Sequence, residues 1–295
     1  MRAEFVSLFE SREFQFDGRA NDPSRLPYQY RLFVPDIKDT NAKLPLVLWL
    51  HGSGEAGDDN LQQLRWLDQL IITRPWQRAR YPFFLLAVQC PSDNRLWFRS
   101  RSSESSDAMV DVAMAILDKT VREFPIDTDR VCLAGVSSGG AGCWELASRQ
   151  PEQFSAVAPM ASFGGDLSRV AHLKGVPVWA FNSTRDATTP VDGIRRTVNS
   201  LKNAGGVAHL TEVDSADHNC WSTAFEDYHL LEWLLAQRRG AASQSPRPGS
   251  ISIRGKIQNT LKGWSLPQLV SQASIPIVLI IVILAIRKSR LRERS

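Results

Sequence analysis

A serine, an aspartate and a histidine that could perform nucleophilic catalysis each follow an apolar run of the sequence. Ser137 lies in Gly135-Val-Ser-Ser-Gly139, between such a run and a helical pattern. A serine on a turn of this kind presents its hydroxyl, and glycines two residues to either side leave room for the turn. Asp186 and His218 follow two later apolar runs. Because parallel strands gather their carboxyl ends at one edge of a sheet, we expect nucleophile, acid and base to meet there.

Other residues fit these roles less well. Asp192 is the alternative acid, but it follows Pro190 at a predicted helix start, where an aspartate usually stabilises the helix end. We therefore assign Asp186. Three other histidines are weaker candidates for the base. His209 lies within a predicted strand, His229 lies within a predicted helix, and His172 lies in a polar connection that no strand precedes.

A buried run at 44–50 leads into His51-Gly-Ser53-Gly54, a turn suited to hold the oxyanion of a tetrahedral intermediate. The predicted donors are the backbone N–H groups of Ser53 and Ser138. We expect His51 to shape its own loop rather than to act as the base, because the task of that turn is to present N–H groups.

Four blocks in this order resemble one group of α/β-hydrolases. They are His51-Gly-Ser-Gly-Glu-Ala-Gly-Asp-Asp-Asn60, Val88-Gln-Cys-Pro91, Gly135-Val-Ser-Ser-Gly-Gly140 with Trp144-Glu-Leu-Ala147, and His218-Asn-Cys-Trp221. The group contains esterases related to feruloyl esterases, polyhydroxyalkanoate depolymerases and phospholipase/carboxylesterases, some labelled predicted peptidases. The resemblance, from about 28 to 238, implies a mostly parallel central sheet with helices on both faces and no large cap domain.

The resemblance also implies the same catalytic set of Ser137, Asp186 and His218, with the Ser53 and Ser138 N–H groups as the oxyanion hole. The sequence departs from the group's pattern at two places. Ser138 stands where methionine is frequent, which should matter little for a backbone donor. Ala56 stands where a basic residue is frequent, at the rim that would face the substrate.

These residues predict a serine hydrolase that cleaves carboxylic esters without a metal or cofactor. A serine peptidase would use the same residues, and a catalytically idle, membrane-tethered binding protein is the alternative of another class. About fifteen residues separate the strand ending near Met160 from the one starting at Val176, too few for a helical cap. An uncapped cleft would admit small, bulky or polymeric esters.

Four other features bear on the fold. Residues 11–34 predict an amino-terminal hairpin, and 106–124 predict an amphipathic helix. No cysteines form a C-x-x-C pair, and a Cys90–Cys220 bridge stays open as a minor alternative. Four tryptophans in connecting segments could line a pocket or simply pack: Trp66, Trp76, Trp97 and Trp221.

The basic residues are concentrated near the carboxyl terminus. Residues 240–295 carry a net charge of +8, whereas the whole chain carries +4, which leaves −4 for residues 1–239. A mildly acidic catalytic domain offers no basic face, so nucleic acid is excluded as a partner.

The sequence divides into a catalytic domain at 1–239, a flexible basic linker at 240–262, a transmembrane helix at 263–286 and a basic tail at 287–295. The uncharged window 263–286 exceeds the roughly 20 residues that a span requires. A helix that docks on the domain or on a partner is the alternative. The first ten residues lack the apolar core of a secretory signal, so we expect a membrane-anchored protein with a cytoplasmic catalytic domain. Charges flanking the span are nearly balanced and leave its sidedness open.

Overall fold

The computed structural model describes residues 2–16, 27–36, 42–67, 78, 80–93, 96–97 and 109–246. The chain divides into two units, Met1–Pro248 and Gly249–Ser295, and all described residues belong to the first. The predicted transmembrane helix at 263–286 therefore lies outside the described residues, as do the basic tail and most of the linker. Within the described ranges, no helix combines the length and the apolar character needed to cross a bilayer.

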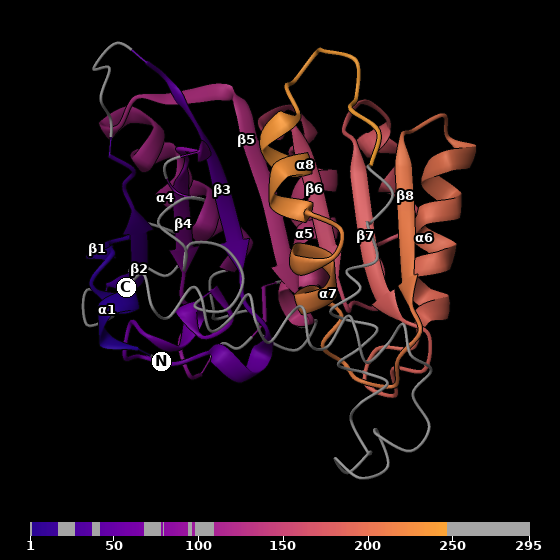
Figure 1. Cartoon of the computed structure of the whole chain (residues 1–295), viewed down its shortest axis with the longest axis horizontal. Coiled ribbons are helices and arrows are strands. Elements are labelled where there is room, and N and C mark those ends of the chain that lie inside the picture. The colour runs from indigo at the N-terminus through magenta and orange to yellow at the C-terminus, as the bar shows by residue number, and fades with distance from the viewer. Residues whose placement is uncertain are drawn as a thin grey trace, which may run out of the picture. The chain divides into compact units, whose positions relative to one another are not determined.

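Eight strands form one sheet with the order β1-β2-β4-β3-β5-β6-β7-β8 (Figure 1). The first two pairings, β1 with β2 and β2 with β4, are antiparallel, and all later pairings are parallel. The bounds are β1 Phe9–Phe14, β2 Tyr28–Phe33, β3 Leu44–Leu50, β4 Phe84–Val88, β5 Ile126–Val136, β6 Ala156–Met160, β7 Val178–Ser183 and β8 Ala208–Val213. The mostly parallel sheet and the β1–β2 hairpin confirm the predictions from the sequence.

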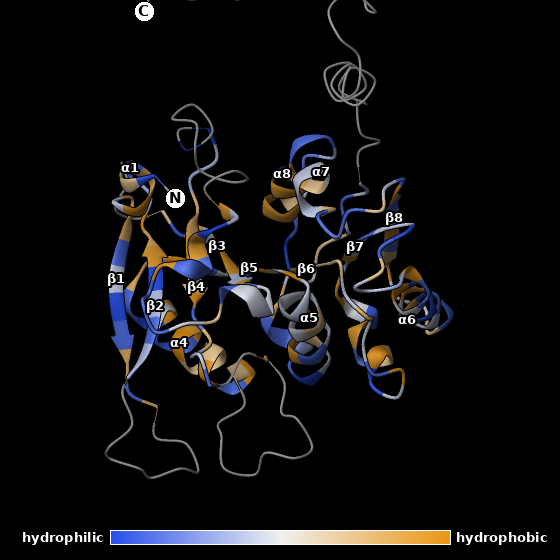
Figure 2. Ribbon diagram, turned by 90° about the horizontal axis from the view of Figure 1, so that it is seen from below, coloured by the Kyte–Doolittle hydropathy of each residue, from blue (hydrophilic) through white to orange (hydrophobic). Residues whose placement is uncertain are grey.

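Helices cover both faces of the sheet, as expected (Figure 2). One core contains residues of α4 (Met109–Glu123), α5 (Ser138–Arg149) and α6 (Val191–Asn203). The other contains residues of α1 (Ala3–Val6), α7 (Trp221–Glu226) and α8 (Leu230–Ala236). The short 3₁₀ helices are η1 Ser53–Glu55, η2 Gln62–Leu64, η3 Pro151–Gln153 and η4 Val170–Gly175.

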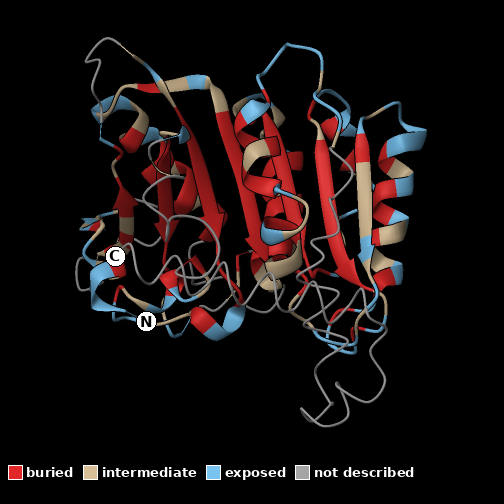
Figure 3. Ribbon diagram, viewed as in Figure 1, coloured by how far each residue is buried: buried red, intermediate tan, exposed pale blue. Residues whose placement is uncertain are grey.

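The central strands are mostly apolar because both of their faces are covered. Every residue of β4, β6 and β7 is buried (Figure 3). Helix α4, in contrast, alternates buried and exposed positions with helical periodicity, as the pattern at 106–124 predicts. The sheet is thus a rigid platform whose carboxyl edge can hold loops in fixed positions.

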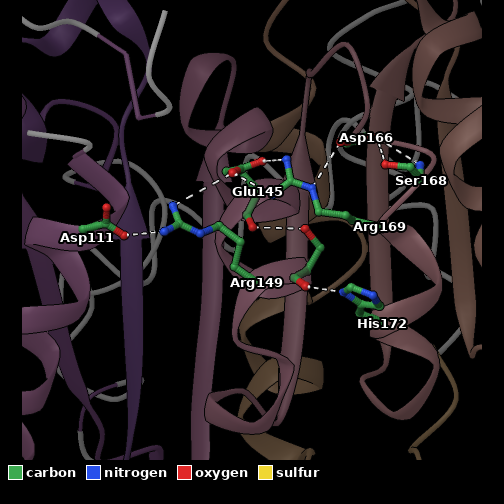
Figure 4. Close-up of polar contacts among 8 residues, drawn as sticks. Asp111, Glu145, Arg149, Asp166, Ser168, Arg169 and His172 are labelled. Carbon is green, nitrogen blue, oxygen red and sulfur yellow. Dashed lines mark hydrogen bonds and ion pairs between the residues drawn. The ribbon is translucent and has the colours of Figure 1, made fainter. Parts of the chain in front are cut away.

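Helix α5, which follows Ser137, is also held on its outer side by a row of ion pairs (Figure 4). Arg149 pairs with Asp111 of α4 at 2.8 Å, and Arg169 pairs with Glu145 at 3.0 Å and with Asp166 at 3.1 Å. These partly exposed pairs are each worth at most about 1 kcal/mol. Together they join α5 to α4 and to the segment that precedes η4.

The connection between β6 and β7 contains only the 3₁₀ helix η4, so no helical cap is inserted there. One local prediction is wrong: His229 does not lie inside a helix. It precedes α8 in the left-handed conformation, with φ of 53°. The reason is the break between α7 and α8, which the continuous apolar pattern of this region does not reveal.

Candidate active site

Ser137 occupies the sharp turn between β5 and α5. Its backbone has φ of 55° and ψ of −118°, a region that non-glycine residues seldom adopt. The strained peptide is held on both sides, because Ser137 N–H donates to the carbonyl of Met160 at 2.9 Å and Ala141 N–H donates to the carbonyl of Ser137 at 3.1 Å. Such strain persists where the surroundings enforce it, and here it projects a serine from the carboxyl edge of the sheet.

Gly135 and Gly139 are required by close backbone contacts at this turn. A Cβ on Gly135 would stand 2.6 Å from the carbonyl oxygen of Gly139. A Cβ on Gly139 would stand 2.0 Å from the carbonyl oxygen of Leu50, at the end of β3. These glycines therefore allow the turn of Ser137 to press against the strand that leads into the His51 loop.

Asp186 and His218 are in direct contact. Asp186 follows β7 and His218 follows β8, and Asp186 Oδ2 lies 2.6 Å from His218 Nδ1. The Asp186 carboxylate also accepts the N–H groups of Thr188 and Thr189 at 2.8 and 3.1 Å and the Thr189 hydroxyl at 2.7 Å. An ionised carboxylate only accepts, so His218 Nδ1 carries the proton and Nε2 is left as an acceptor.

Asp186 is 5% exposed, and its environment favours the ionised form. Burial opposes ionisation, but the hydrogen bonds from His218, from the Thr189 hydroxyl and from the two backbone N–H groups outweigh it. They hold the pKa of Asp186 below its usual value. A charged acceptor of this kind is suited to orient an imidazole and to stabilise its protonated form.

The alternative acid, Asp192, lies elsewhere. It stands in the first turn of α6, where its carboxylate pairs with Arg195 at 2.9 Å and its side chain is 71% exposed. A carboxylate at this position stabilises the helix start. Of the two aspartates, Asp186 is the one that the structure brings to His218.

His51 holds the predicted oxyanion loop in place. Its Nε2 accepts the N–H of Cys90 at 3.0 Å, so Nδ1 carries the hydrogen and donates to the carbonyl of Gly52 at 2.6 Å. Burial lowers the pKa of His51 to about 4, only partly opposed by the bond to Gly52, and the ring is neutral at pH 7. His51 is thus a structural histidine of its own loop, as predicted.

The hydrogen bond from His51 Nδ1 to the Gly52 carbonyl also sets the direction of the Ser53 N–H, the predicted oxyanion donor. In a trans peptide the C=O and N–H point in opposite directions, and the described residues contain no cis peptide. Because His51 fixes the Gly52 carbonyl, the Ser53 N–H is directed away from the His51 ring. A Cβ on Gly52 would lie 3.4 Å from Ser137 Cβ, so this loop directly adjoins Ser137.

Ser138 is the first residue of α5, where backbone N–H groups lack partners within the helix and the helix dipole favours negative charge. Its N–H is therefore available to an oxyanion beside Ser137. The roles of the Ser53 and Ser138 N–H groups stay predictions.

One of the four tryptophans contacts His218, and a second packs on the first. Trp221 packs edge-on against His218 with ring centroids 5.6 Å apart, and Trp66 packs on Trp221 at 5.1 Å. Trp97 is buried beneath the oxyanion loop and donates its indole N–H to the carbonyl of His51 at 2.8 Å. Trp76 lies outside the described residues.

Cys90 and Cys220 are unpaired and buried, so the Cys90–Cys220 bridge is absent. Burial raises the pKa of the Cys220 thiol to about 12, which keeps it protonated and unreactive. Within the described part of the chain, no three or more His, Cys, Asp or Glu side chains are grouped as metal ligands.

The sequence did not predict a role for Thr189 or Glu55, and it predicted Trp66 only as a residue that lines a pocket or packs. The contact with Thr189 could have been found, because an aspartate in a turn commonly accepts the backbone N–H groups of the residues two and three positions later. Trp66 donates to the Glu55 carboxylate at 3.1 Å. This hydrogen bond between Trp66 and Glu55 joins two segments of the chain, and no local sequence pattern predicts that they meet.

Similar proteins are esterases and other hydrolases. "Putative esterase NocK" from Nocardia uniformis subsp. tsuyamanensis is 32% identical over 89 residues, which cover 30% of this chain and 26% of that protein. The crystal structure of a thermostable esterase is 31% identical, with a TM-score of 0.70 over 79% of this chain and 64% of that chain. This chain therefore spans less than two thirds of either protein, and no family model matches it.

More distant structures share the fold alone. A ferulic acid esterase is 17% identical, with a TM-score of 0.59 over 77% of this chain and 97% of that chain. An acylaminoacyl peptidase of Pyrococcus horikoshii is 14% identical, with a TM-score of 0.58 over 82% and 44% of the two chains. The chain thus has an α/β-hydrolase fold with a mostly parallel eight-stranded sheet, and its similarity in sequence is to esterases.

Proposed function

We propose that this protein is a serine hydrolase that cleaves carboxylic esters through an acyl-enzyme intermediate. The observation that carries the proposal is the strained turn of Ser137 at the sheet edge where Asp186 and His218 are in hydrogen-bond contact. The 31% identity to a thermostable esterase supports the choice of ester substrates.

In the proposed first step, Ser137 Oγ attacks the ester carbonyl carbon while His218 Nε2 takes the hydroxyl proton. The carbonyl π electrons move to oxygen, and the resulting oxyanion accepts the N–H groups of Ser53 and Ser138. Each such donor is worth about 2.7 to 4 kcal/mol in the transition state. Ionised Asp186 stabilises the imidazolium that forms.

The tetrahedral intermediate then collapses. The bond from carbon to the alcohol oxygen breaks, and the alcohol leaves with the proton from His218 Nε2, which produces the acyl-Ser137 ester. His218 next deprotonates a water molecule that attacks this ester. Release of the carboxylic acid returns the proton to Ser137, so the cycle consumes one water for each ester and uses no cofactor.

The surroundings of the site favour esters of some bulk. The connection between β6 and β7 carries no helical cap. A site that has no cap from this connection and has Trp221 packed against His218 suits bulky or polymeric esters as well as small ones. A serine peptidase would use the same residues, so amide substrates belong in the test.

We further propose that the uncharged segment 263–286 anchors the enzyme to a lipid bilayer. This proposal rests on the length and apolar composition of the segment.

Hydrolysis of a panel of acyl, aryl and phospholipid esters and of acyl-aminoacyl amides tests the proposal. We expect turnover of esters well above that of amides in the wild type, and a loss of at least about 10⁴-fold in Ser137→Ala. Ser200→Ala on α6 is the matched control and should stay active. An ester activity that persists in Ser137→Ala would refute the proposal, and a preference for amides would favour the peptidase.

A further inference from the structure

Only two carboxylic acids are buried among the described residues, Asp186 and Glu55, and the proposed reaction uses one of them. Glu55 is 6% exposed and belongs to the loop that carries Ser53. Burial raises the pKa of the Glu55 carboxyl, an effect partly offset by the hydrogen bond from Trp66 and by the charge of Arg65. Burial of a carboxyl is costly unless hydrogen bonds or an opposite charge compensate it.

The contacts of Glu55 lock both ends of the oxyanion turn. Its own N–H donates to the carbonyl of Gly52 at 3.1 Å, and its carboxyl receives the N–H of Gly52 in return. The two bonds enclose the 3₁₀ turn Ser53–Glu55, with Gly52 as its N-cap and Glu55 three residues later. A Cβ on Gly52 would stand only 2.9 Å from Glu55 Oε2, so carboxyl and turn are in tight contact.

The other carboxyl oxygen connects this turn to the histidine. Trp66 Nε1 donates to Glu55 Oε1 at 3.1 Å. The Trp66 ring packs on Trp221, and the Trp221 ring packs on His218. One chain of contacts thus runs from the loop that holds the predicted oxyanion donor to the predicted base.

We infer that Glu55 is a positioning residue: its carboxyl holds the Gly52 N–H, in the His51–Gly52 peptide at the start of the turn, and through Trp66 and Trp221 it sets the distance of the adjoining Gly52–Ser53 peptide from His218. The inference rests on the proposed function, because it assigns Glu55 a task in forming the oxyanion hole. A displaced donor weakens binding of the oxyanion, which exists only in the transition state, so kcat should fall while KM is kept.

Glu55→Gln tests the inference with little change of shape. The amide offers one acceptor oxygen, and its NH₂ group then faces a backbone or indole N–H that can only donate. We expect kcat for a soluble ester to fall about 10- to 100-fold, less than removal of a whole donor would cost, with KM changed by less than about threefold. Glu226→Gln, an exposed carboxyl on α7, is the matched control and should retain wild-type values.

Trp66→Phe is the second variant, and it keeps the inference testable if Glu55→Gln does not fold. It removes the indole N–H but retains an aromatic ring beside Trp221, so kcat should fall in the same direction. The double variant should lose less than the product of the two single effects, because both act on one contact.

Wild-type kcat in Glu55→Gln, whether or not its melting temperature falls, would overturn the inference and leave the proposed function intact. A raised KM with unchanged kcat would also overturn it, since Glu55 would then contact the substrate. If instead the wild type lacks hydrolysis that depends on Ser137, the proposed function fails, and this inference fails with it.

Discussion

The Asp186 carboxylate accepts four hydrogen bonds, one from His218 and three from Thr188 and Thr189. These bonds keep it charged although it is buried, and a fixed charge holds the imidazole in a single tautomer. Because its folded-state pKa is lowered, the carboxylate contributes stability above its usual pKa, and this contribution is lost as the pH falls through the lowered value.

Replacement of Asp186 by asparagine should lower kcat by up to about 10⁴-fold, because an amide no longer selects the Nδ1–H tautomer of His218. Asp192→Asn should leave kcat within about twofold, since Asp192 pairs with Arg195 on the helix surface. Steady-state hydrolysis of a soluble ester measures both. The acid assignment would be wrong if the two variants exchanged these outcomes.

His51 should make the folded protein sensitive to mild acid. In the folded state its pKa is about 4, whereas an unburied histidine titrates near 6.5. Between these values the unfolded chain binds the extra proton and the folded one does not, so the free energy of unfolding falls with decreasing pH, by up to about 3 kcal/mol. Below about pH 4 the protonated Nε2 would face the Cys90 N–H, and the loop would lose its anchor.

Urea unfolding at several pH values measures this effect. His51→Asn should be less stable at pH 7, but its free energy of unfolding should change less between pH 6.5 and 4 than that of the wild type. Parallel curves for the two proteins would show that His51 does not cause the acid sensitivity.

At the scale of elements, the site depends on where strands end. Four strands end at the same edge of the sheet (Figure 1). The His51 loop follows β3, Ser137 follows β5, Asp186 follows β7, and the His218 loop follows β8. The ends of these strands could be predicted from sequence because each apolar run stops at a polar or glycine-rich segment. Their meeting at one edge follows from parallel pairing.

Other parts of the site could not be predicted this way. The contact of Glu55 with Trp66 and the edge-to-face packing of Trp66 on Trp221 are tertiary contacts, which periodicity does not encode. The tautomer of His51 depends on Cys90, 39 residues away. Local chemistry did identify Asp186 over Asp192, since the latter lies at a helix start, where a carboxylate has a simpler role.

A substitution at Gly139 tests the contact between α5 and β3 at the turn of Ser137. In Gly139→Ala the new Cβ would lie 2.0 Å from the carbonyl oxygen of Leu50, so β3 and α5 must move apart. We expect a loss of about 1 to 3 kcal/mol or more in stability and a loss of ester hydrolysis, because both Ser137 and the oxyanion loop shift. Thermal unfolding and activity assays measure the two effects.

Gly175→Ala is the control, because a Cβ at Gly175 meets no atom within 4 Å. It should change stability by less than about 1 kcal/mol. Equal effects of the two substitutions would contradict the packing argument.

At the scale of the whole molecule, the acidic first unit and the basic, apolar carboxyl-terminal sequence have different composition. Residues 240–246 still contact the domain, since the Gln244 carbonyl accepts the Trp233 indole N–H at 2.8 Å and Gln244 N–H donates to Gln237 at 3.0 Å. The first unit ends at Pro248. A truncation that preserves the domain should therefore follow Pro248 rather than Arg239.

The chain ended at Pro248 should be soluble and should retain nearly full activity on small soluble esters, because every proposed catalytic residue lies within it. Full-length protein should remain with membranes through high-salt and carbonate washes, since burial of apolar surface is not screened by salt. A chain ended at Arg239 should unfold at a lower temperature, because it lacks the hydrogen bonds of Gln244 with Trp233 and Gln237. Release of full-length protein by salt would contradict the membrane anchor, and aggregation of the Pro248 truncation would indicate that the apolar segment packs on the domain.

Covalent labelling shows directly whether Ser137 is the nucleophile. The protein is treated with a fluorophosphonate, which phosphonylates activated serines, and the modified peptide is located by mass spectrometry. We expect one adduct for each chain, on Ser137, formed in parallel with loss of ester hydrolysis and absent from Ser137→Ala. An adduct on another serine that inactivates the enzyme, or full ester hydrolysis without any adduct on Ser137, would show that Ser137 is not the nucleophile.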